Sequence, residues 1–332
     1  MARRLNWGLL STAKINAALI KPLNASNRTR LLAVASRSQS SAEAYAREWR
    51  IPRPYGSYEA LLADPEIDVI YNSLPNHLHA EWTIRALRAG RHVLCEKPLA
   101  LTLAEVDAMT RASHETGRVL MEAFMYRHHP QTLKVKELVE DDAVGELRFI
   151  RGSFTFTLDR PGNYRQIKEM GGGSIWDVGC YPISYARMIV GEEPLEVFGW
   201  QVKGPSGSDE TFAGQMRFAN NILFQFDSSF QSPFRASMEI VGADGILSIP
   251  EPFKPGRNES IYLRRGDKEE AVKIQGEELY RGEVENMVDV ILNGSSPRVT
   301  LADSRGTIAA ILGLLDSAET GSVVKLSALH ES

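Results

Sequence analysis

Cysteine is scarce in this sequence, and so are long hydrophobic runs and any excess of one charge sign. Only two of the 332 residues are cysteines, Cys95 and Cys180, too few for a disulfide framework or a structural zinc site. No stretch approaches the roughly 20 consecutive apolar residues of a membrane span. The formal net charge of -4 leaves no basic excess for nucleic acid. We therefore expect a cytoplasmic protein with no metal, membrane or nucleic-acid partner.

Two arginines near the start, Arg3 and Arg4, resemble the beginning of a twin-arginine export signal. The residues that follow are too few and too polar for the apolar segment of such a signal. We therefore expect a first β-strand over residues 5–10 in place of a leader.

The first 124 residues alternate short apolar runs with amphipathic segments. This alternation predicts a parallel sheet with helices on both faces. The expected strands cover residues 5–10, 31–35, 69–73, 91–95 and 119–123. The expected helices cover residues 14–23, 41–49, 58–63, 77–89 and 103–115. At about 150 residues per domain the length predicts two domains, which we assign to residues 1–124 and 125–332.

The second part of the chain has a different pattern. Apolar side chains alternate with polar ones, and turn signals separate the segments, as in an antiparallel sheet with one covered face. The expected strands cover residues 153–158, 212–218, 222–226, 236–241 and 246–249. Helices are expected over residues 279–292 and 302–318.

The turn after the first expected strand, residues 8–16, occupies the place of a glycine-rich nucleotide-binding turn. The three positions of G-x-G-x-x-G hold Ser11, Ala13 and Asn16. Small side chains still allow the backbone to approach a pyrophosphate, and the hydroxyl groups of Ser11 and Thr12 can donate to it. The alternative is a strand–turn–helix unit that binds no nucleotide.

No aspartate or glutamate precedes Glu43, although a carboxylate after the second strand normally holds the ribose of NAD. That strand instead ends at Ser36, Arg37 and Ser38. A guanidinium between two hydroxyl groups suits the 2′-phosphate of NADP, because arginine can bind phosphate through two hydrogen bonds. We therefore expect NADP, with NAD less favoured. The alternative is that Arg37 only faces solvent.

A further candidate follows the strand expected over residues 91–95. It runs directly into Glu96, Lys97 and Pro98. Ligands of open α/β sheets bind beyond the carboxyl ends of the strands, and a following proline keeps Lys97 out of a helix. Lys97 is therefore placed where chemistry would occur.

Three segments of the chain, residues 90–99, 121–130 and 171–182, resemble the Gfo/Idh/MocA oxidoreductases. The chain is most similar to the branch with glucose–fructose oxidoreductase, dimeric dihydrodiol dehydrogenase, NADP-dependent xylose dehydrogenase and sugar 3-ketoreductases. The resemblance implies a doubly wound Rossmann domain followed by an α+β domain with an open, mostly antiparallel sheet. It also implies that Lys97 lies in the active site beside a cis peptide bond. The degenerate turn and the tyrosine at position 181 depart from the common pattern.

Two further candidates, Asp177 and Tyr181, share one face of a helix if that helix begins at Ser174. The glycines at 171–173 would let a ligand approach closely. Tyr181 is the expected proton donor, its phenolate form favoured by the Lys97 ammonium group, and Asp177 would orient the substrate hydroxyl or Lys97. The alternatives are structural: Ser174 and Asp177 also fit a capping box, and Tyr181 fits a packed aromatic before a proline.

The resemblance also places Arg165 near the nicotinamide or the substrate. The expected catalytic residues are Lys97, Asp177 and Tyr181. The expected cofactor contacts are Gly8, Ser11, Thr12, Ala13, Lys14, Ile15, Ser36, Arg37, Ser38, Ser73, Leu74, Pro75, Asn76, His79, Glu96, Lys97 and Arg165.

These residues predict an NADP(H)-dependent oxidoreductase that transfers a hydride to or from a CH–OH or C=O carbon of a sugar or sugar-like polyol. One alternative is a trans-1,2-dihydrodiol dehydrogenase. Another is a regulator that binds NADP without catalysis. The resemblance further implies a homodimer, or a tetramer of paired dimers, formed through one face of the C-terminal sheet. That face carries Ala213, Gln215, Arg217, Leu223, Gln225 and Asp227.

Overall fold

The computed structural model describes residues 3–160 and 162–326, and the chain divides into two compact units. The first unit comprises the chain up to His128 together with Tyr280–Ser304. The second comprises His129–Leu279 and the chain from Arg305 onward. These units differ from the expected ranges 1–124 and 125–332 chiefly in Tyr280–Ser304, which packs with the N-terminal unit.

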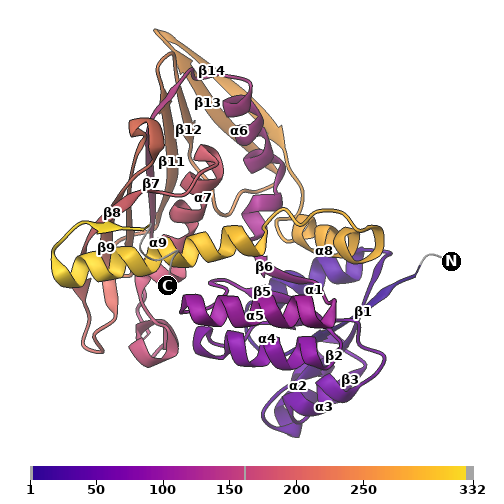
Figure 1. Ribbon diagram of the computed structural model, residues 1–332. Helices are drawn as coiled ribbons and strands as arrows, with labels where there is room; N and C mark the ends of the chain where they lie inside the picture. The colour runs from indigo at the N-terminus through magenta and orange to yellow at the C-terminus, as the bar shows by residue number, and fades with distance from the viewer. Residues whose placement is uncertain (1–2, 161, 327–332) are drawn as a thin grey trace. The chain divides into compact units, whose positions relative to one another are not determined.

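The first unit is built on a six-stranded parallel sheet of order β3-β2-β1-β4-β5-β6. Figure 1 shows this sheet in indigo to magenta, with helices packed against it. This confirms the predicted doubly wound fold. Its strands are β1 (Leu5–Leu9), β2 (Thr29–Ala35), β3 (Arg53–Tyr55), β4 (Val69–Asn72), β5 (His92–Glu96) and β6 (Leu120–Ala123). Its helices are α1 (Asn16–Ala25), α2 (Gln39–Trp49), α3 (Tyr58–Ala63), α4 (His79–Arg88), α5 (Leu103–Thr116) and α8 (Arg281–Asn293), with short 3₁₀ turns η1 (Asn76–Leu78) and η2 (Met125–His128).

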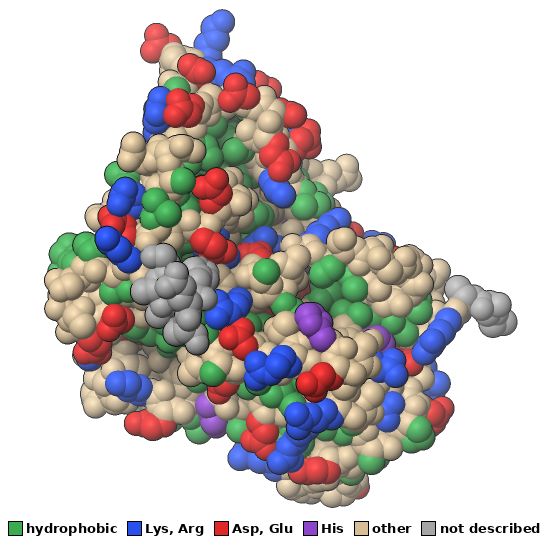
Figure 2. All heavy atoms as spheres, in the orientation of Figure 1, with side chains coloured by type: hydrophobic (Ala, Val, Ile, Leu, Met, Phe, Trp, Pro, Cys, Tyr) green, Lys and Arg blue, Asp and Glu red, His purple; other side chains and the backbone are tan. Residues whose placement is uncertain are grey.

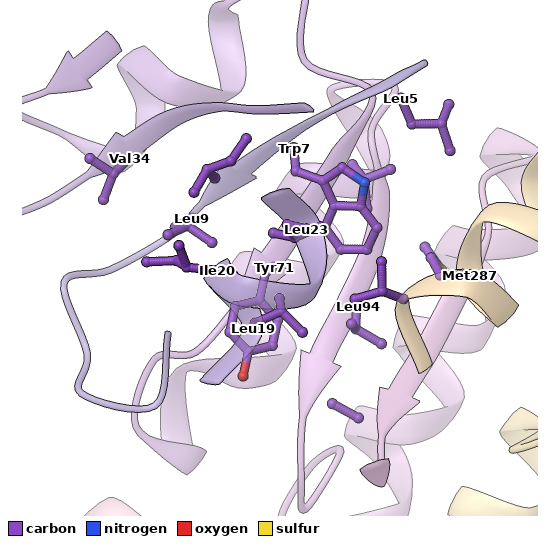
Figure 3. Close-up of a cluster of buried hydrophobic side chains, with 14 of the residues drawn as sticks. Leu5, Trp7, Leu9, Leu19, Ile20, Leu23, Val34, Tyr71, Leu94 and Met287 are labelled. Atoms are coloured by element: carbon purple, nitrogen blue, oxygen red, sulfur yellow. The ribbon is translucent and has the colours of Figure 1, made fainter. Parts of the chain in front are cut away.

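A core of this unit lies between one face of the sheet and the helices α1 and α8 that cover it. Trp7, Tyr71 and Leu94 project from three neighbouring strands and are fully buried. Figure 3 shows Met287 of α8 in the same cluster, where it is also fully buried. A helix from late in the sequence therefore completes the core of the N-terminal unit.

Local signals explain where helix α5 begins and ends. Thr102 and Glu105 form a capping box that satisfies the first N–H groups of the helix. Gly117 ends it in the left-handed conformation, at φ 63°, which glycine adopts without steric cost.

The second unit is built on a nine-stranded sheet of order β14-β13-β12-β11-β7-β10-β9-β8-β15. It is antiparallel except for the pairing of β7 with β10, which confirms the predicted mostly antiparallel sheet. Its strands are β7 (Leu147–Thr155), β8 (Glu196–Lys203), β9 (Asp209–Arg217), β10 (Leu223–Ser229), β11 (Arg235–Gly242), β12 (Ile246–Ile249), β13 (Asn258–Arg265), β14 (Lys268–Gln275) and β15 (Val324–Lys325). Its helices are α6 (Pro130–Glu140), α7 (Cys180–Val190) and most of α9 (Leu301–Thr320), and its short turns are η3 (Tyr164–Gln166), η4 (Lys168–Met170), η5 (Ile175–Gly179) and η6 (Ala219–Asn221).

The two faces of this sheet differ, as the alternation of residues predicts. Phe212, Met216, Phe224 and Phe226 are buried on one face of β9 and β10. The opposite face is exposed at Ala213, Gln215, Leu223 and Gln225. The tight connection between these strands uses Asn220 and Asn221 at φ 55° and 61°, the left-handed region that asparagine tolerates better than most residues.

The strand expected over residues 153–158 is misplaced, because β7 begins at Leu147 and ends at Thr155. No helix in the described ranges is both long and apolar enough to cross a membrane. On the face of the molecule in Figure 2, acidic and basic side chains are interspersed.

Candidate active site

The turn between β1 and α1 is organised by a chain of buried hydrogen bonds. Ser73 Oγ donates to Asn16 Oδ1 at 2.6 Å, and Asn16 Nδ2 donates to the Ser11 carbonyl at 2.7 Å. Ser11 Oγ lies 2.7 Å from Ser73 Oγ, whose proton is already used, so Ser11 is the donor in that contact. Ser11 Oγ also accepts the N–H of Ala13 at 3.0 Å. In this arrangement the Ser11 proton holds the turn together, and a contact of Ser11 with phosphate stays a prediction.

The backbone of the same turn fits a bound diphosphate. Among the described residues, no group accepts the N–H of Thr12, Lys14 or Ile15, which precede the first residue of α1. Unpartnered N–H groups at the start of a helix, together with the helix dipole, form an anion-binding site. The residues present therefore fit the diphosphate of a dinucleotide without the usual glycines.

Gly8 lies within β1 and not in the turn. A Cβ atom there would approach Leu61 Cδ1 to 3.0 Å and Ile70 Cδ1 to 3.3 Å. The glycine thus allows α3 to pack closely on the sheet, and its assignment to the cofactor stays a prediction.

Arg37 stands at the carboxyl end of β2 with an exposed side chain. Ser36 precedes it, and Ser38 is the N-cap of α2, where its hydroxyl oxygen accepts the N–H of Ser41 at 3.3 Å. No described carboxylate forms an ion pair with Arg37, so its charge is available to an incoming anion.

The loop after β4, which contains Ser73, Leu74, Pro75 and Asn76, is tied to helix α4 by His79. His79 Nε2 lies 2.8 Å from the Leu74 carbonyl oxygen, and His79 Nδ1 lies 2.8 Å from the Pro98 carbonyl oxygen. The side chain is fully buried, and burial lowers the pKa of His79 to about 4. Both ring nitrogens of His79 thus face backbone carbonyls, and its contact with the cofactor stays a prediction.

Lys97 follows β5 directly, and its peptide bond to Pro98 is cis. The Lys97 N–H donates to Glu96 Oε2 at 3.2 Å, and Glu96 Oε1 accepts the phenol proton of Tyr71 at 2.5 Å. Burial raises the pKa of Tyr71 well above its usual value, so this phenol stays protonated as a donor. On the other side of Lys97, the N–H of Leu99 donates to the buried Glu122 of β6.

In the second unit, Asp177 lies in a single π-helical turn, η5, that leads into α7. Asp177 Oδ2 accepts a hydrogen bond from Arg165 Nε at 2.8 Å. Burial alone would lower the pKa of Arg165, but the Asp177 carboxylate raises it above its usual value. Single π-helical turns are frequent at functional sites, where they re-aim side chains.

The capping-box alternative for Asp177 is wrong. Ser174 Oγ donates to Asp209 Oδ2 at 2.6 Å, and the N–H of Asp177 donates to the Gly173 carbonyl at 3.1 Å. Asp209 also accepts the N–H of Ile175 at 2.9 Å. Asp209, at the start of β9, thus anchors the turn that carries Asp177.

The glycines before this turn allow other parts of the chain to pack closely against the backbone. A Cβ atom on Gly173 would lie 2.2 Å from Asp209 Oδ1, and one on Gly172 would lie 2.7 Å from the Arg165 carbonyl. Gly173 also has φ 137°, a conformation that other residues rarely adopt. We therefore assign these glycines to contacts with Asp209 and the Arg165 backbone, where the sequence suggested a ligand.

Tyr181 is near the start of α7, one turn after Asp177, and is 4% exposed. Its ring packs edge-on against Phe154, with centroids 5.2 Å apart, and against Phe253 at 5.6 Å. The packed-aromatic reading of Tyr181 is therefore correct for its ring. That packing fixes the position of the phenol oxygen.

The candidate catalytic residues come from both units. Lys97 belongs to the first unit, and Asp177, Tyr181 and Arg165 belong to the second. The pairing of Arg165 with Asp177 lies within one unit, whereas the approach of Lys97 to Tyr181 stays a prediction. Within the described residues, no three His, Cys, Asp or Glu side chains form a group that could hold a metal ion.

Three residues that the sequence did not suggest form hydrogen bonds to the segments that carry the candidate catalytic residues. Tyr71 and Glu122 contact the Lys97 segment, and Asp209 contacts the Asp177 segment. These residues are far in sequence from the groups they contact, so no local sequence motif could have predicted the contacts.

Comparison with known proteins identifies the family. Residues 5–124 match the model described as "Oxidoreductase family, NAD-binding Rossmann fold", and residues 132–248 match the "GFO/IDH/MocA C-terminal domain". The chain belongs to the Gfo/Idh/MocA oxidoreductase family. It is an NAD(P)-dependent oxidoreductase with an NAD(P)-binding Rossmann domain.

Three relatives illustrate the range of this family. D-xylose 1-dehydrogenase (NADP(+)) 2 of Haloferax volcanii is 35% identical over 324 residues, 96% of this chain and 99% of the relative. Trans-1,2-dihydrobenzene-1,2-diol dehydrogenase of Xenopus laevis is 33% identical over 250 residues, 74% of each chain. The solved structure of a 3-ketoreductase from Actinomadura kijaniata, in complex with NADP and TDP-benzene, is 27% identical, with a TM-score of 0.90 over 95% of this chain and 98% of that one.

Proposed function

We propose that this protein is an NADP(H)-dependent oxidoreductase that transfers a hydride to or from a CH–OH or C=O carbon of a sugar or sugar-like polyol. The observation that carries the proposal is the arrangement of Arg165, Asp177 and Tyr181, with a fixed carboxylate one helical turn before a fixed phenol. Fixed groups of this kind suit the orientation and deprotonation of a hydroxyl-bearing substrate. The likeness to a xylose dehydrogenase supports a sugar.

The reaction divides between the cofactor and the side chains. A bound nicotinamide supplies the hydride chemistry. Tyr181 exchanges the proton of the substrate hydroxyl, and the Lys97 ammonium group favours its phenolate form. Asp177, held by Arg165, orients the substrate hydroxyl.

The proposed cofactor is NADP. The exposed Arg37 and the hydroxyl of Ser36 would hold its 2′-phosphate, and the N–H groups of Thr12, Lys14 and Ile15 would hold its diphosphate. The NADP in the name of the xylose dehydrogenase and in the 3-ketoreductase complex supports this choice. The two cysteines support a reducing compartment, the cytoplasm.

The experiment is to combine the purified protein with NADP⁺ or NAD⁺ and a panel of aldoses, polyols and trans-dihydrodiols, and to follow absorbance of the reduced cofactor. We expect turnover with NADP⁺ and at least one sugar. Turnover confined to dihydrodiols would favour the alternative that the Xenopus laevis relative supports. Binding of NADP without turnover of any compound would favour a regulator.

The catalytic assignment has its own variant. Tyr181→Phe removes the phenol oxygen but keeps the ring that packs on Phe154 and Phe253. Turnover should fall by roughly 10²–10⁴-fold while the Kd for NADPH stays unchanged. Full activity of Tyr181→Phe would remove the phenol from the mechanism.

We further propose that the protein forms a homodimer, or a tetramer of paired dimers, through the outer face of the C-terminal sheet. Trp200 and Val202 of β8 are 63% and 64% exposed on this face, and Leu223 of β10 is 44% exposed. Large apolar side chains gathered on one sheet face favour burial against a second copy, and a two-fold axis lets the same surface meet itself.

A further inference from the structure

Pro98 follows Lys97, and the peptide group that joins Pro98 to Leu99 is contacted at both ends by buried side chains. Its C=O faces Nδ1 of His79 at 2.8 Å, and its N–H donates to Glu122 Oε1 at 2.8 Å. His79 is fully buried on α4, and Glu122 is 1% exposed on β6. A peptide group is planar and rigid, so contacts at both ends fix its orientation.

We propose that His79, in the neutral tautomer that carries its proton on Nδ1 and donates it to the Pro98 carbonyl, and Glu122 are positioning residues for Lys97, which they orient by holding the two ends of the Pro98–Leu99 peptide group. The inference rests on the proposed function, in which Lys97 acts in the active site. It gives two buried polar side chains a role in the reaction although neither belongs to the expected catalytic set.

The other side of Lys97 is held in a similar way. Its own N–H donates to Glu96 Oε2, and Tyr71 donates to the second oxygen of that carboxylate. The backbone is therefore restrained immediately before and after Lys97. A displacement of about 1 Å at a reacting group can cost about 100-fold in rate, so such restraint has a measurable value.

The surroundings of Glu122 show that its burial is not explained by an ion pair. Glu122 Oε2 accepts no hydrogen bond from the described residues. The side chains that affect the pKa of Glu122 are those of Ser304, Asp303 and Arg127, and the Arg127 guanidinium is paired with Asp303 at 2.7 Å. A buried carboxyl that is only half satisfied is costly for stability, which argues for a benefit elsewhere.

The test for Glu122 compares two substitutions. Glu122→Gln keeps an oxygen for the Leu99 N–H, whereas Glu122→Met has similar length and no acceptor. We expect kcat of Glu122→Met to fall by about tenfold or more, and that of Glu122→Gln to stay within about threefold of the natural protein. The Kd for NADPH should change little in either variant, because the contact lies on the Lys97 segment.

The test for His79 uses a second pair. The amide nitrogen of asparagine occupies about the position of Nδ1, and that of glutamine about the position of Nε2. His79→Asn should therefore keep the contact with Pro98 and retain more of kcat than His79→Gln, which keeps only the contact with Leu74. Ser113→Ala, which removes a buried hydrogen bond to Arg118 before β6, is the control for general loss of packing.

Deuterium exchange of the peptide that contains Leu99 gives a readout that needs no turnover. Its amide should exchange faster in Glu122→Met than in Glu122→Gln or Ser113→Ala. Equal kcat and equal exchange in the two Glu122 variants would overturn the role of Glu122, and a higher kcat in His79→Gln than in His79→Asn would overturn that of His79. A protein that turns over no compound would instead refute the proposed function, while the exchange comparison would still test the contact.

Discussion

Reversal of the charge at Arg37 should weaken the binding of NADP far more than that of NAD. Arg37 is exposed at the carboxyl end of β2, and no described carboxylate neutralises it. The substitution Arg37→Asp removes the proposed donor to the 2′-phosphate and puts a negative charge in its place. NAD lacks this phosphate, so its affinity should be unchanged or improved.

The magnitude follows from the exposure of the site. A hydrogen bond to a charged group contributes about 1.5–3 kcal/mol, and exposure favours the lower half of that range. Repulsion between the new carboxylate and the phosphate adds about 1 kcal/mol in a well-solvated setting. The sum of about 2.5–3 kcal/mol corresponds to a rise of roughly 100-fold in the Kd for NADP.

The assay is a fluorescence titration with NADPH and with NADH at low and moderate salt. Arg30→Asp is the matched control, because Arg30 is exposed near the opposite end of the same strand. It makes the same change in net charge far from the proposed phosphate. The reasoning would be refuted if Arg37→Asp weakened NADPH no more than Arg30→Asp, or weakened NADH equally.

Three other substitutions give expected outcomes. Met287→Ala, which opens a cavity in the core of the first unit, should lower the free energy of unfolding by about 2–5 kcal/mol in urea denaturation. Trp200→Glu should shift the mass in light scattering toward the monomer's 36.9 kDa, whereas Leu133→Glu on α6 should not. Burial raises the pKa of Glu122 to about 7 from an ordinary 4.5, so the natural protein should lose stability as pH rises from about 4.5 to 7. Glu122→Gln should lack that loss and gain on the natural protein by roughly 1–3 kcal/mol at pH 8 relative to pH 5, and equal pH dependence of the two would contradict the assignment.

The parallel sheet was predictable because its strands are continuous apolar runs and its helices carry local end signals. Thr102 with Glu105 and Gly117 illustrate this for α5. In contrast, β13 and β14 were not predicted, because β14 is mostly exposed and β13 has only two buried side chains, so neither strand gives a clear alternation of apolar residues. The boundaries of β7 were missed for a similar reason, since its first residues are only partly buried.

The sequence proposed Asp177, Tyr181 and Lys97 as candidates, but it could not reveal which residues hold their segments in place. The contact between Glu122 and Leu99 depends on the adjacency of β5 and β6, and that between Ser174 and Asp209 joins residues 35 positions apart. The partner of the Ser11 hydroxyl could not be predicted, because a hydroxyl group in a turn can donate to phosphate or to a neighbour, and only the positions of Ser73 and Asn16 show that it donates to Ser73 here.

The place of α8 in the N-terminal core has a consequence for how the protein is made. Val284, Met287 and Val288 fill the first unit, yet the ribosome adds them after the whole of β7 to β14. The core of the first unit therefore stays partly exposed while the second unit is synthesised, although N-terminal domains usually fold first during translation. A gene fragment that stops at Leu279 should accordingly yield a chain that aggregates or requires a chaperone, and adding the α8 peptide in trans should rescue it.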